Sequence, residues 1–178
     1  NDIRPVSLRF DNMQMPVFRM EGIEITLRMP GLHNIYNALA GFAVAKALGI
    51  SGADSAEAIS SFHPDAMRSE IVTHNGLTLI VDCYNANPTS MKFALETLSG
   101  MSCGGRRVAV LADMLELGDR SRFYHEEIGR LAKELKIDYL FGFGPLTKHA
   151  VELFGEGGRH YDDKEGLSKF LSEAVNPG

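Results

Sequence analysis

The sequence is poor in cysteine and has no long hydrophobic stretch. Its two cysteines, Cys83 and Cys103, lack the CxxC spacing of a metal or redox site and are too few for a disulfide framework. No apolar run approaches the length of about 18 residues that a membrane-spanning helix needs, and no signal-peptide pattern opens the chain. We therefore expect a cytoplasmic protein with reduced thiols and no membrane segment.

Two signals of nucleotide or nucleic-acid binding are also absent. The chain contains neither a GxxxxGK[ST] phosphate loop nor a GxGxxG motif, and its glycine clusters at 104–105, 142–144 and 155–158 are most simply turns. The formal net charge is -5, and the only basic pair, Arg106 and Arg107, precedes an apolar run. This charge argues against a nucleic-acid partner, which would require a basic face on the protein.

What is present is the balance of an ordinary globular protein, with 44% hydrophobic and 23% charged residues in a chain of 178. Three short runs at 6–10, 16–20 and 23–29 predict a small antiparallel sheet, the last by its clear alternation. Helical spacing then predicts helices over 34–48 and 55–62. Pro64 disfavours helix at His63, so we expect a domain that ends at residue 63 and a second that begins at 66.

Strands and helices alternate beyond this boundary. We expect strands at 70–74, 77–81, 107–111, 139–143 and 159–161, and helices at 90–98, 121–135, 145–154 and 164–174. Asn75-Gly76 between the first two strands is a hairpin signal, and the later alternation predicts parallel strands with crossover helices. The predicted fold class is α/β: a Rossmann-like, doubly wound, mostly parallel sheet over 66–178, preceded by an incomplete segment of antiparallel strands and helices over 1–63. We expect the last strand of the second domain and its terminal segment to be missing.

The strongest candidate for a ligand site follows the strand at 77–81. Asp82 ends this strand, and Asn85, Asn87 and Ser90 follow around a proline before the next helix. In an open α/β sheet the carboxyl ends of strands are where ligands bind. Asp82 could be a buried capping acid or could accept hydrogen bonds from ribose hydroxyls.

Two other segments carry weaker signals. Asn34 and Asn37 are three residues apart, so a helix would place both amides on one face, where a carboxamide can recognise adenine. The alternative for Asn34 is a helix N-cap. Arg68, just past the boundary, is either a surface cation or a fork for a phosphate.

A third segment is the acidic loop that follows the strand at 107–111. Asp113, Glu116 and Asp119 cluster there, and the loop is either simply solvated or a site for a cationic group such as an amine. His125 in the next helix is best interpreted as a structural, hydrogen-bonding histidine. The spacing of His and Cys does not support a metal site in this chain.

Taken together, the segments GLHNIYNALAGFAVAKALGI, MRSE, VDCYNANPTSMKFALETL and VLADMLELGDRSRFYHEEIG, in this order and at these separations, resemble the Mur ligase family. The resemblance covers essentially the whole chain. It implies that residues 1–63 are the end of a central ATP-binding domain and that 66–178 are the C-terminal Rossmann-like ligase domain. The YNANP form of the strand-end motif resembles the family member that adds a dipeptide.

The resemblance implies an ATP-dependent amide ligase of peptidoglycan synthesis. Its partners would be UDP-N-acetylmuramoyl-tripeptide and D-alanyl-D-alanine, joined through an acyl phosphate, with ATP and Mg²⁺ required and the magnesium ligands outside this chain. By the same resemblance, ATP-binding residues would be Asn34, Asn37, Arg68 and Asp82, and dipeptide-side residues Asn85, Asn87, Ser90, Asp113 and Glu116. No catalytic residue is implied in this chain, which we expect to be an inactive fragment of a monomeric enzyme. The alternatives are a sister amino-acid ligase of the family and a non-catalytic Rossmann-like binding module.

Overall fold

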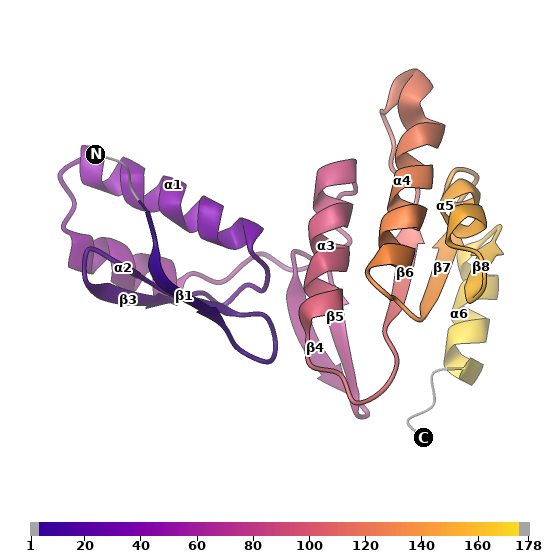
Figure 1. The fold of residues 1–178 in the computed structure, drawn as a ribbon, viewed down its shortest axis with the longest axis horizontal. Coiled ribbons are helices and arrows are strands. Elements are labelled where there is room, and N and C mark those ends of the chain that lie inside the picture. Colours follow the sequence, from indigo (N-terminus) through magenta and orange to yellow (C-terminus); the bar gives the residue numbers. More distant parts are fainter. Residues whose placement is uncertain (1–3, 175–178) are drawn as a thin grey trace.

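The structure, a computed structural model, describes residues 4–174. Its N-terminal unit is an antiparallel sheet in the order β1 (Val6–Phe10), β2 (Pro16–Met20), β3 (Ile23–Thr26), followed by helices α1 (His33–Ala47) and α2 (Gly52–Ser61). Figure 1 shows this unit on one side of the molecule and the remaining elements on the other. The predicted antiparallel sheet and the two helices after it are thus present.

One face of this sheet and the inner sides of both helices form a small core. Phe18 and Met20 alternate along β2 and are buried together with Ile25 of β3. Phe42 of α1 and Ala56 of α2 close the cluster. The core is small because the sheet offers only one apolar face, which follows from the period of two in a strand.

The other side of α1 is apolar as well, yet it is exposed. Leu32, Tyr36, Val44 and Leu48 recur every four or eight residues and are exposed by 46%, 63%, 60% and 74%. Residues four apart lie on one face of a helix, so these side chains form a continuous row that we call the outer α1 stripe. A helix that is hydrophobic all round is characteristic of a buried position.

The C-terminal unit begins with a hairpin of β4 (Glu70–His74) and β5 (Leu77–Val81), joined by Asn75-Gly76. It continues with α3 (Pro88–Gly100), β6 (Val108–Ala112), the 3₁₀ turn η1 (Gly118–Arg120), α4 (Ser121–Glu134), β7 (Tyr139–Phe143), α5 (Thr147–Phe154), β8 (Gly158–Tyr161) and α6 (Lys164–Ala174). Strands β6, β7 and β8 pair in parallel in that order, and the hairpin is a separate antiparallel pair. The predicted α/β class is confirmed.

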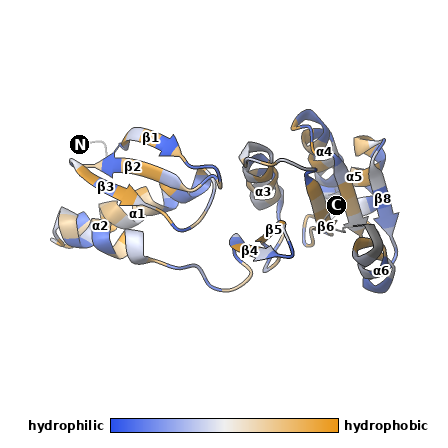
Figure 2. Ribbon diagram, turned by 90° about the horizontal axis from the view of Figure 1, so that it is seen from below, coloured by the Kyte–Doolittle hydropathy of each residue, from blue (hydrophilic) through white to orange (hydrophobic). Residues whose placement is uncertain are grey.

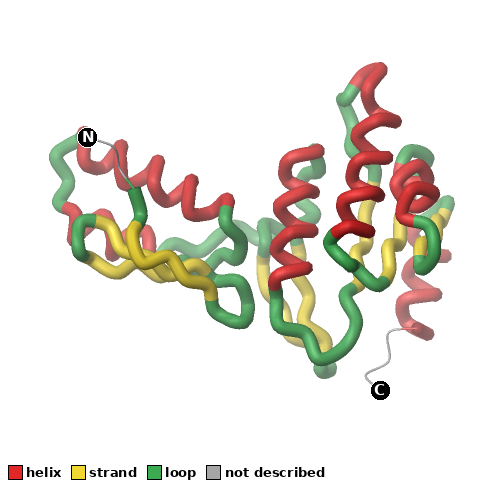
Figure 3. The backbone as a smooth tube through the Cα atoms, viewed as in Figure 1, coloured by secondary structure: helices red, strands yellow, loops and turns green. Residues whose placement is uncertain are grey.

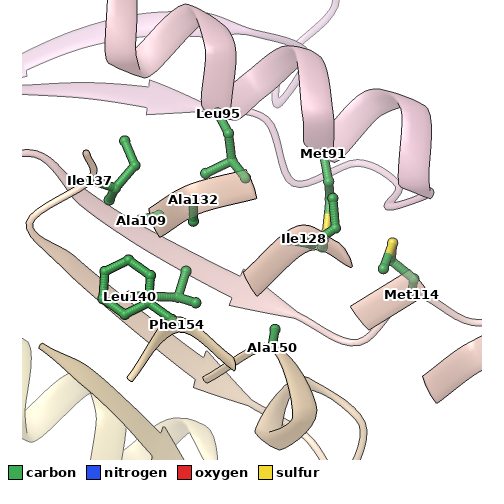
Figure 4. Close-up of a cluster of buried hydrophobic side chains, with 10 residues drawn as sticks. All are labelled: Met91, Leu95, Ala109, Met114, Ile128, Ala132, Ile137, Leu140, Ala150 and Phe154. Carbon is green, nitrogen blue, oxygen red and sulfur yellow. The ribbon is translucent and has the colours of Figure 1, made fainter. Parts of the chain in front are cut away.

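Helices cover both faces of the parallel sheet. Figure 2 shows α4 and α5 on one side and α6 on the other, with α3 over the β4–β5 hairpin. The core between the sheet and α3, α4 and α5 consists of ten buried side chains (Figure 4): Met91, Leu95, Ala109, Met114, Ile128, Ala132, Ile137, Leu140, Ala150 and Phe154. This core includes Met114 of the loop after β6 and Met91 of α3, so it holds the start of that loop and the helix that follows β5.

Some element boundaries differ from those predicted, for local reasons. β3 ends at Thr26 rather than Met29, and beyond its end Arg28 donates from its guanidinium to the Ser60 carbonyl of α2 at 3.0 Å. α2 begins earlier than predicted because Ser51 accepts a hydrogen bond from the Asp54 amide and acts as its N-cap. The segment from α2 to β4 is a loop in Figure 3, and the domain boundary placed there stays a prediction.

Candidate functional site

One candidate site is a pocket of about 580 Å³ in the N-terminal unit. Its walls come from the end of β3 and the residues after it, from α1 and α2, and from the start of the connection to the second unit. The lining is mostly apolar with a few polar groups: Leu27, Arg28, Met29, Asn34, Asn37, Ala38, Gly41, Ala45, Ile50, Asp54, Ser55, Ala58, Ile59 and Phe62. A mostly apolar cavity with a few polar groups is the usual form of a small-molecule site.

The two amides predicted to share a face do so, and both line the pocket. Asn34 is buried and donates from Nδ2 to the Pro30 carbonyl at 2.8 Å, which fixes the plane of its amide. Asn37 donates from Nδ2 to Asn34 Oδ1 at 3.1 Å. The N-cap alternative for Asn34 is wrong, because the helix N-cap is Leu32 and Asn34 lies inside the first turn. The linked amides present a fixed polar edge to a mostly apolar cavity.

The turn around Arg68 is joined to the end of β5 by three hydrogen bonds. Ser69 N–H donates to Asp82 Oδ1 at 3.1 Å, and the amides of Cys83 and Tyr84 donate to the Met67 carbonyl at 3.1 and 3.2 Å. This follows from the antiparallel register of β4 and β5, which pairs Glu70 with Val81 and continues outward. The structure therefore brings the segments of Arg68 and Asp82, which are 14 residues apart in sequence, next to each other.

Arg68 is held over an aromatic ring. Its guanidinium carbon lies 3.8 Å from the ring centroid of Tyr84, a cation–π contact. Met67 and Ser69 on either side of it have left-handed backbones with φ of 65° and 50°, each at a cost of about 1 kcal/mol. Strain of this kind gathers at functional sites. Sequence reasoning missed Tyr84, although an aromatic residue two positions after the strand-end carboxylate was a usable signal.

The polar side chains that follow Asp82 make hydrogen bonds to nearby backbone amides. Asn87 Oδ1 accepts from the Ser90 amide at 2.9 Å, and Ser90 Oγ accepts from the Asn87 amide at 3.1 Å. This reciprocal pair is the capping box of α3. Asn85 Oδ1 accepts from the Ala86 amide at 2.9 Å. The assignment of Asn85, Asn87 and Ser90 to the dipeptide stays a prediction.

In the acidic loop after β6, one carboxylate accepts hydrogen bonds within the protein and two are exposed to solvent. Asp113 Oδ1 accepts from the amides of Leu146 and Thr147 at 3.0 and 2.8 Å, so it caps the start of α5. Glu116 is exposed and has a left-handed backbone with φ of 61°, and Asp119 is exposed in η1. Among the loop's acidic side chains, Glu116 and Asp119 are therefore the ones presented to solvent.

His125 anchors that loop from within. It is fully buried, its Nε2 accepts from the Met114 amide at 3.0 Å, and its Nδ1 lies 2.8 Å from the Ser121 carbonyl. This pattern requires a proton on Nδ1 and a bare Nε2, as in a neutral imidazole. The interpretation of His125 as a structural histidine is confirmed.

The N-terminus of α1 lies close to the strand-end turn. Burial lowers the pKa of His33, which directly precedes Asn34, while the carboxylates of Asp82 and Glu96 act in the opposite direction. His33 lies near enough to Asp82 to feel its charge, so the N-terminus of α1 and the turn at the end of β5 are neighbours. Within residues 4–174, no three His, Cys, Asp or Glu side chains form a group that could hold a metal ion, and no helix has the length and hydrophobicity to cross a bilayer.

Comparison with known proteins assigns this arrangement to a class. The family model for "Mur ligase, glutamate ligase domain" matches residues 67–178, more than half of the chain, so the chain belongs to the Mur ligase family. Within that family it is similar to the UDP-N-acetylmuramoyl-tripeptide–D-alanyl-D-alanine ligase of Bacillus subtilis, with 37% identity over 169 residues. That alignment covers 90% of this chain and 37% of the relative.

Solved structures give the same likeness. A MurF crystal structure from Acinetobacter baumannii superposes with a TM-score of 0.89 at 28% identity, over 98% of this chain and 38% of that one. MurF from Thermotoga maritima, solved in complex with ADP, superposes with a TM-score of 0.79 over 96% of this chain and 40% of that one; at 23% identity it speaks for the fold alone. The chain thus spans well under half the length of the relatives it matches.

Proposed function

We propose that the whole protein is an ATP-dependent ligase that joins D-alanyl-D-alanine to UDP-N-acetylmuramoyl-tripeptide. The observation that carries this is the 37% identity over 169 residues to the Bacillus subtilis ligase. The pocket beside α1 and the turn at the end of β5 supply, in that context, the groups that adenosine recognition needs. We further propose a monomeric protein in the cytoplasm.

In this proposal the chain holds the adenosine of ATP from two sides. The linked amides of Asn34 and Asn37 recognise the adenine edge at the apolar pocket, since carboxamides pair with the donor and acceptor of adenine. Asp82 accepts from the ribose hydroxyls with the oxygen that Ser69 leaves free, and Arg68 approaches the ribose or a phosphate. The ring of Tyr84 holds Arg68 in place for this.

The chemistry needs orientation rather than a covalent protein intermediate. The tripeptide carboxylate attacks the γ-phosphate to form an acyl phosphate, and the dipeptide amine then displaces phosphate through a tetrahedral intermediate. Bringing the reactants together and excluding water account for most of the acceleration in such a step. The residues of this chain bind and orient; the phosphate-binding loop belongs to another part of the protein.

The incoming dipeptide is assigned to the loops after β5 and β6. Glu116, which is exposed, is the carboxylate available to its ammonium group, and Asn85 follows the strand-end turn. The side-chain oxygens of Asn87, Ser90 and Asp113 already accept the hydrogen bonds that cap α3 and α5, so in this proposal these residues shape the two loops. No cluster of three or more His, Cys, Asp or Glu side chains in residues 4–174 could hold Mg²⁺, and we propose that its ligands lie in another part of the whole protein.

The test is a phosphate-release assay on the full-length protein. With UDP-N-acetylmuramoyl-tripeptide and ATP, D-alanyl-D-alanine should support turnover, whereas meso-diaminopimelate or lysine added to the shorter precursor would identify a sister ligase. Asp82→Ala should raise the ATP KM by about tenfold, because hydrogen bonds to neutral hydroxyls are worth about 1–2 kcal/mol. No turnover with any acceptor would leave the non-catalytic module, and an unchanged KM would remove Asp82 from the ribose.

A further inference from the structure

The two units touch along one face of α3. Gln14 Nε2 donates to the Gly100 carbonyl at 2.8 Å, and the Ser102 amide donates to the Asn12 carbonyl at 2.9 Å. The ring of His33 stacks on Phe93 with centroids 4.8 Å apart and planes 20° apart. We call this set of contacts the α3 contact; in Figure 1, α3 is the helix of the second unit that faces the first.

Two glycines allow this close approach. A Cβ at Gly31, whose φ is +97°, would lie 2.6 Å from Thr97 Oγ1, and one at Gly100 would lie 2.8 Å from the Gln14 side chain. Phe93, Thr97 and Gly100 are spaced by four and three residues, so they lie on one helical face. The units therefore meet through a matched surface rather than through a single touching side chain.

His33 is a ring of the first unit that lies in this surface. Its Nδ1 is buried and has no hydrogen-bond partner in the described residues. The charged groups that act on it are Asp82 at the end of β5 and Glu96 on α3, both from the second unit. Its immediate neighbour in sequence is Asn34, whose amide lines the pocket.

We propose that His33, through its stack on Phe93, is a positioning residue that sets the separation between the adenine-side amides of α1 and the ribose-side carboxylate Asp82. The inference rests on the proposed function and adds to it a residue that touches neither nucleotide nor acceptor. Asn34 moves with His33 as the next residue of the helix, and Asp82 moves with α3 as part of the second unit. Loss of the stack lets the two halves of the adenosine site drift apart.

Spin-label distances in the full-length protein test the contact without any assay of activity. Labels at exposed positions of α2 and α5, in variants Glu57→Cys and Lys148→Cys with the native cysteines replaced by serine, report the separation of the units. The unmodified contact should give one narrow distribution, and His33→Ala should broaden it. His33→Phe, which keeps an aromatic stack, should restore it, and the exposed His74→Ala is the matched control.

Kinetics test the link to the nucleotide. His33→Ala and Phe93→Ala should each raise the ATP KM by about five- to tenfold, as expected from an aromatic pair, with kcat at saturating ATP changed less than twofold. The double variant should be no worse than either single one, because both act through one stack. His33→Phe should recover most of the wild-type KM.

The outcomes separate the two proposals. An inactive wild-type protein overturns the proposed function, whereas an active one with the same distance distribution in His33→Ala overturns the positioning role. Additive effects of His33→Ala and Phe93→Ala, or equal losses in kcat and KM for every substrate, also overturn it. Broadening of the distribution together with a rise in the ATP KM alone supports it.

Discussion

Asp113 determines how the loop after β6 meets the start of α5. One of its oxygens accepts hydrogen bonds from two consecutive amides, those of Leu146 and Thr147. A negative group at a helix N-terminus also complements the helix dipole. Gly144 makes room for the carboxylate, since its φ is +104° and a Cβ there would lie 2.7 Å from the carboxyl carbon of Asp113.

Gly144→Ala is therefore expected to reduce the free energy of unfolding by about 2–3 kcal/mol, from backbone strain together with the displaced cap. The matched control is Gly105→Ala, where a Cβ meets nothing within 4 Å and the change should stay within about 0.5 kcal/mol. Urea denaturation of both variants measures the difference. Equal stability of the two would contradict the assigned role of Gly144.

Single residues were predicted from sequence only where the signal was local. Asn34 and Asn37 share a face because three-residue spacing on a helix requires it, and His125 was expected to be structural because it sits one turn into a helix beside a loop. The contact of Arg68 with Tyr84 depends instead on hairpin register and on two left-handed residues. No pattern in the sequence encodes those dihedral angles.

At the scale of elements, the two ends of α3 make different contacts. Its N-terminus is closed by the capping box of Asn87 and Ser90, next to the predicted dipeptide side. Its later turns carry Phe93, Thr97 and Gly100, which meet the N-terminal unit. One helix therefore joins the turn at the end of β5 to the contact between the two units.

Substitution at Asn87 separates capping from substrate binding. Asn87→Ala should cost about 1 kcal/mol of stability, while Asn87→Asp should cost little, because both Asn and Asp are good N-caps. If the amide also binds the dipeptide, Asn87→Asp should raise the KM for D-alanyl-D-alanine by about fivefold through loss of one donor. An unchanged dipeptide KM in Asn87→Asp would limit Asn87 to the cap. Thermal unfolding and steady-state kinetics are the two measurements.

Helices α4 and α5 cross with almost no space between them. A Cβ at Gly129 of α4 would lie 2.1 Å from the Ala150 carbonyl oxygen of α5. Gly129→Ala should therefore destabilise by about 1–3 kcal/mol through overpacking. The helical control Gly41→Ala in α1, with open space around it, should instead stabilise by about 0.5–1 kcal/mol. Opposite signs in chemical denaturation are the expected result; a stabilising Gly129→Ala would contradict this packing.

The order and type of the elements follow from local rules, which is why they were predictable. Asn75-Gly76 gave the hairpin because both residues tolerate the positive φ that its turn requires, 49° and 77° here. The α2 start was missed because Ser51, its N-cap, lies before a glycine that breaks the apparent pattern. The sequence predicted the hairpin but did not show that it would form a sheet of its own. Whether β5 pairs with β6 depends on contacts between residues distant in sequence.

For the whole molecule, the α3 contact predicts a pH dependence. Burial lowers the pKa of His33 in the contact below the value of 6.5 that it has in water, with Asp82 and Glu96 opposing this shift. The separated units therefore bind a proton more readily than the joined ones. The contact is at full strength above pH 6.5 and weakens as the pH falls from 6.5 through the lowered pKa.

The ATP KM of the full-length protein should consequently rise on acidification below pH 6.5. His33→Phe, which has no titrating ring, should flatten this part of the profile, and His74→Ala should leave it unchanged. Steady-state kinetics in a series of buffers at constant ionic strength measure it. A profile that is identical in His33→Phe and wild type would rule out His33 as its source.

Relations between the units were beyond the reach of the sequence. The contact joins residues such as Gln14 and Gly100, 86 positions apart, through a side-chain amide and a carbonyl. Neither residue type in isolation signals a domain contact. The sequence indicated a split adenosine site only through the family resemblance, and the stack of His33 on Phe93, which we propose positions its halves, came from the structure.

The outer α1 stripe should lower the solubility of residues 1–178 as an isolated polypeptide. Leu32, Tyr36, Val44 and Leu48 present a row of apolar side chains to water, and exposed apolar patches of this kind are aggregation liabilities. The polypeptide should bind hydrophobic dyes, precipitate at low concentrations of ammonium sulfate and attract chaperones during expression. Charged replacements along the row, such as Val44→Lys, are the rational way to obtain it in a form suited to spectroscopy.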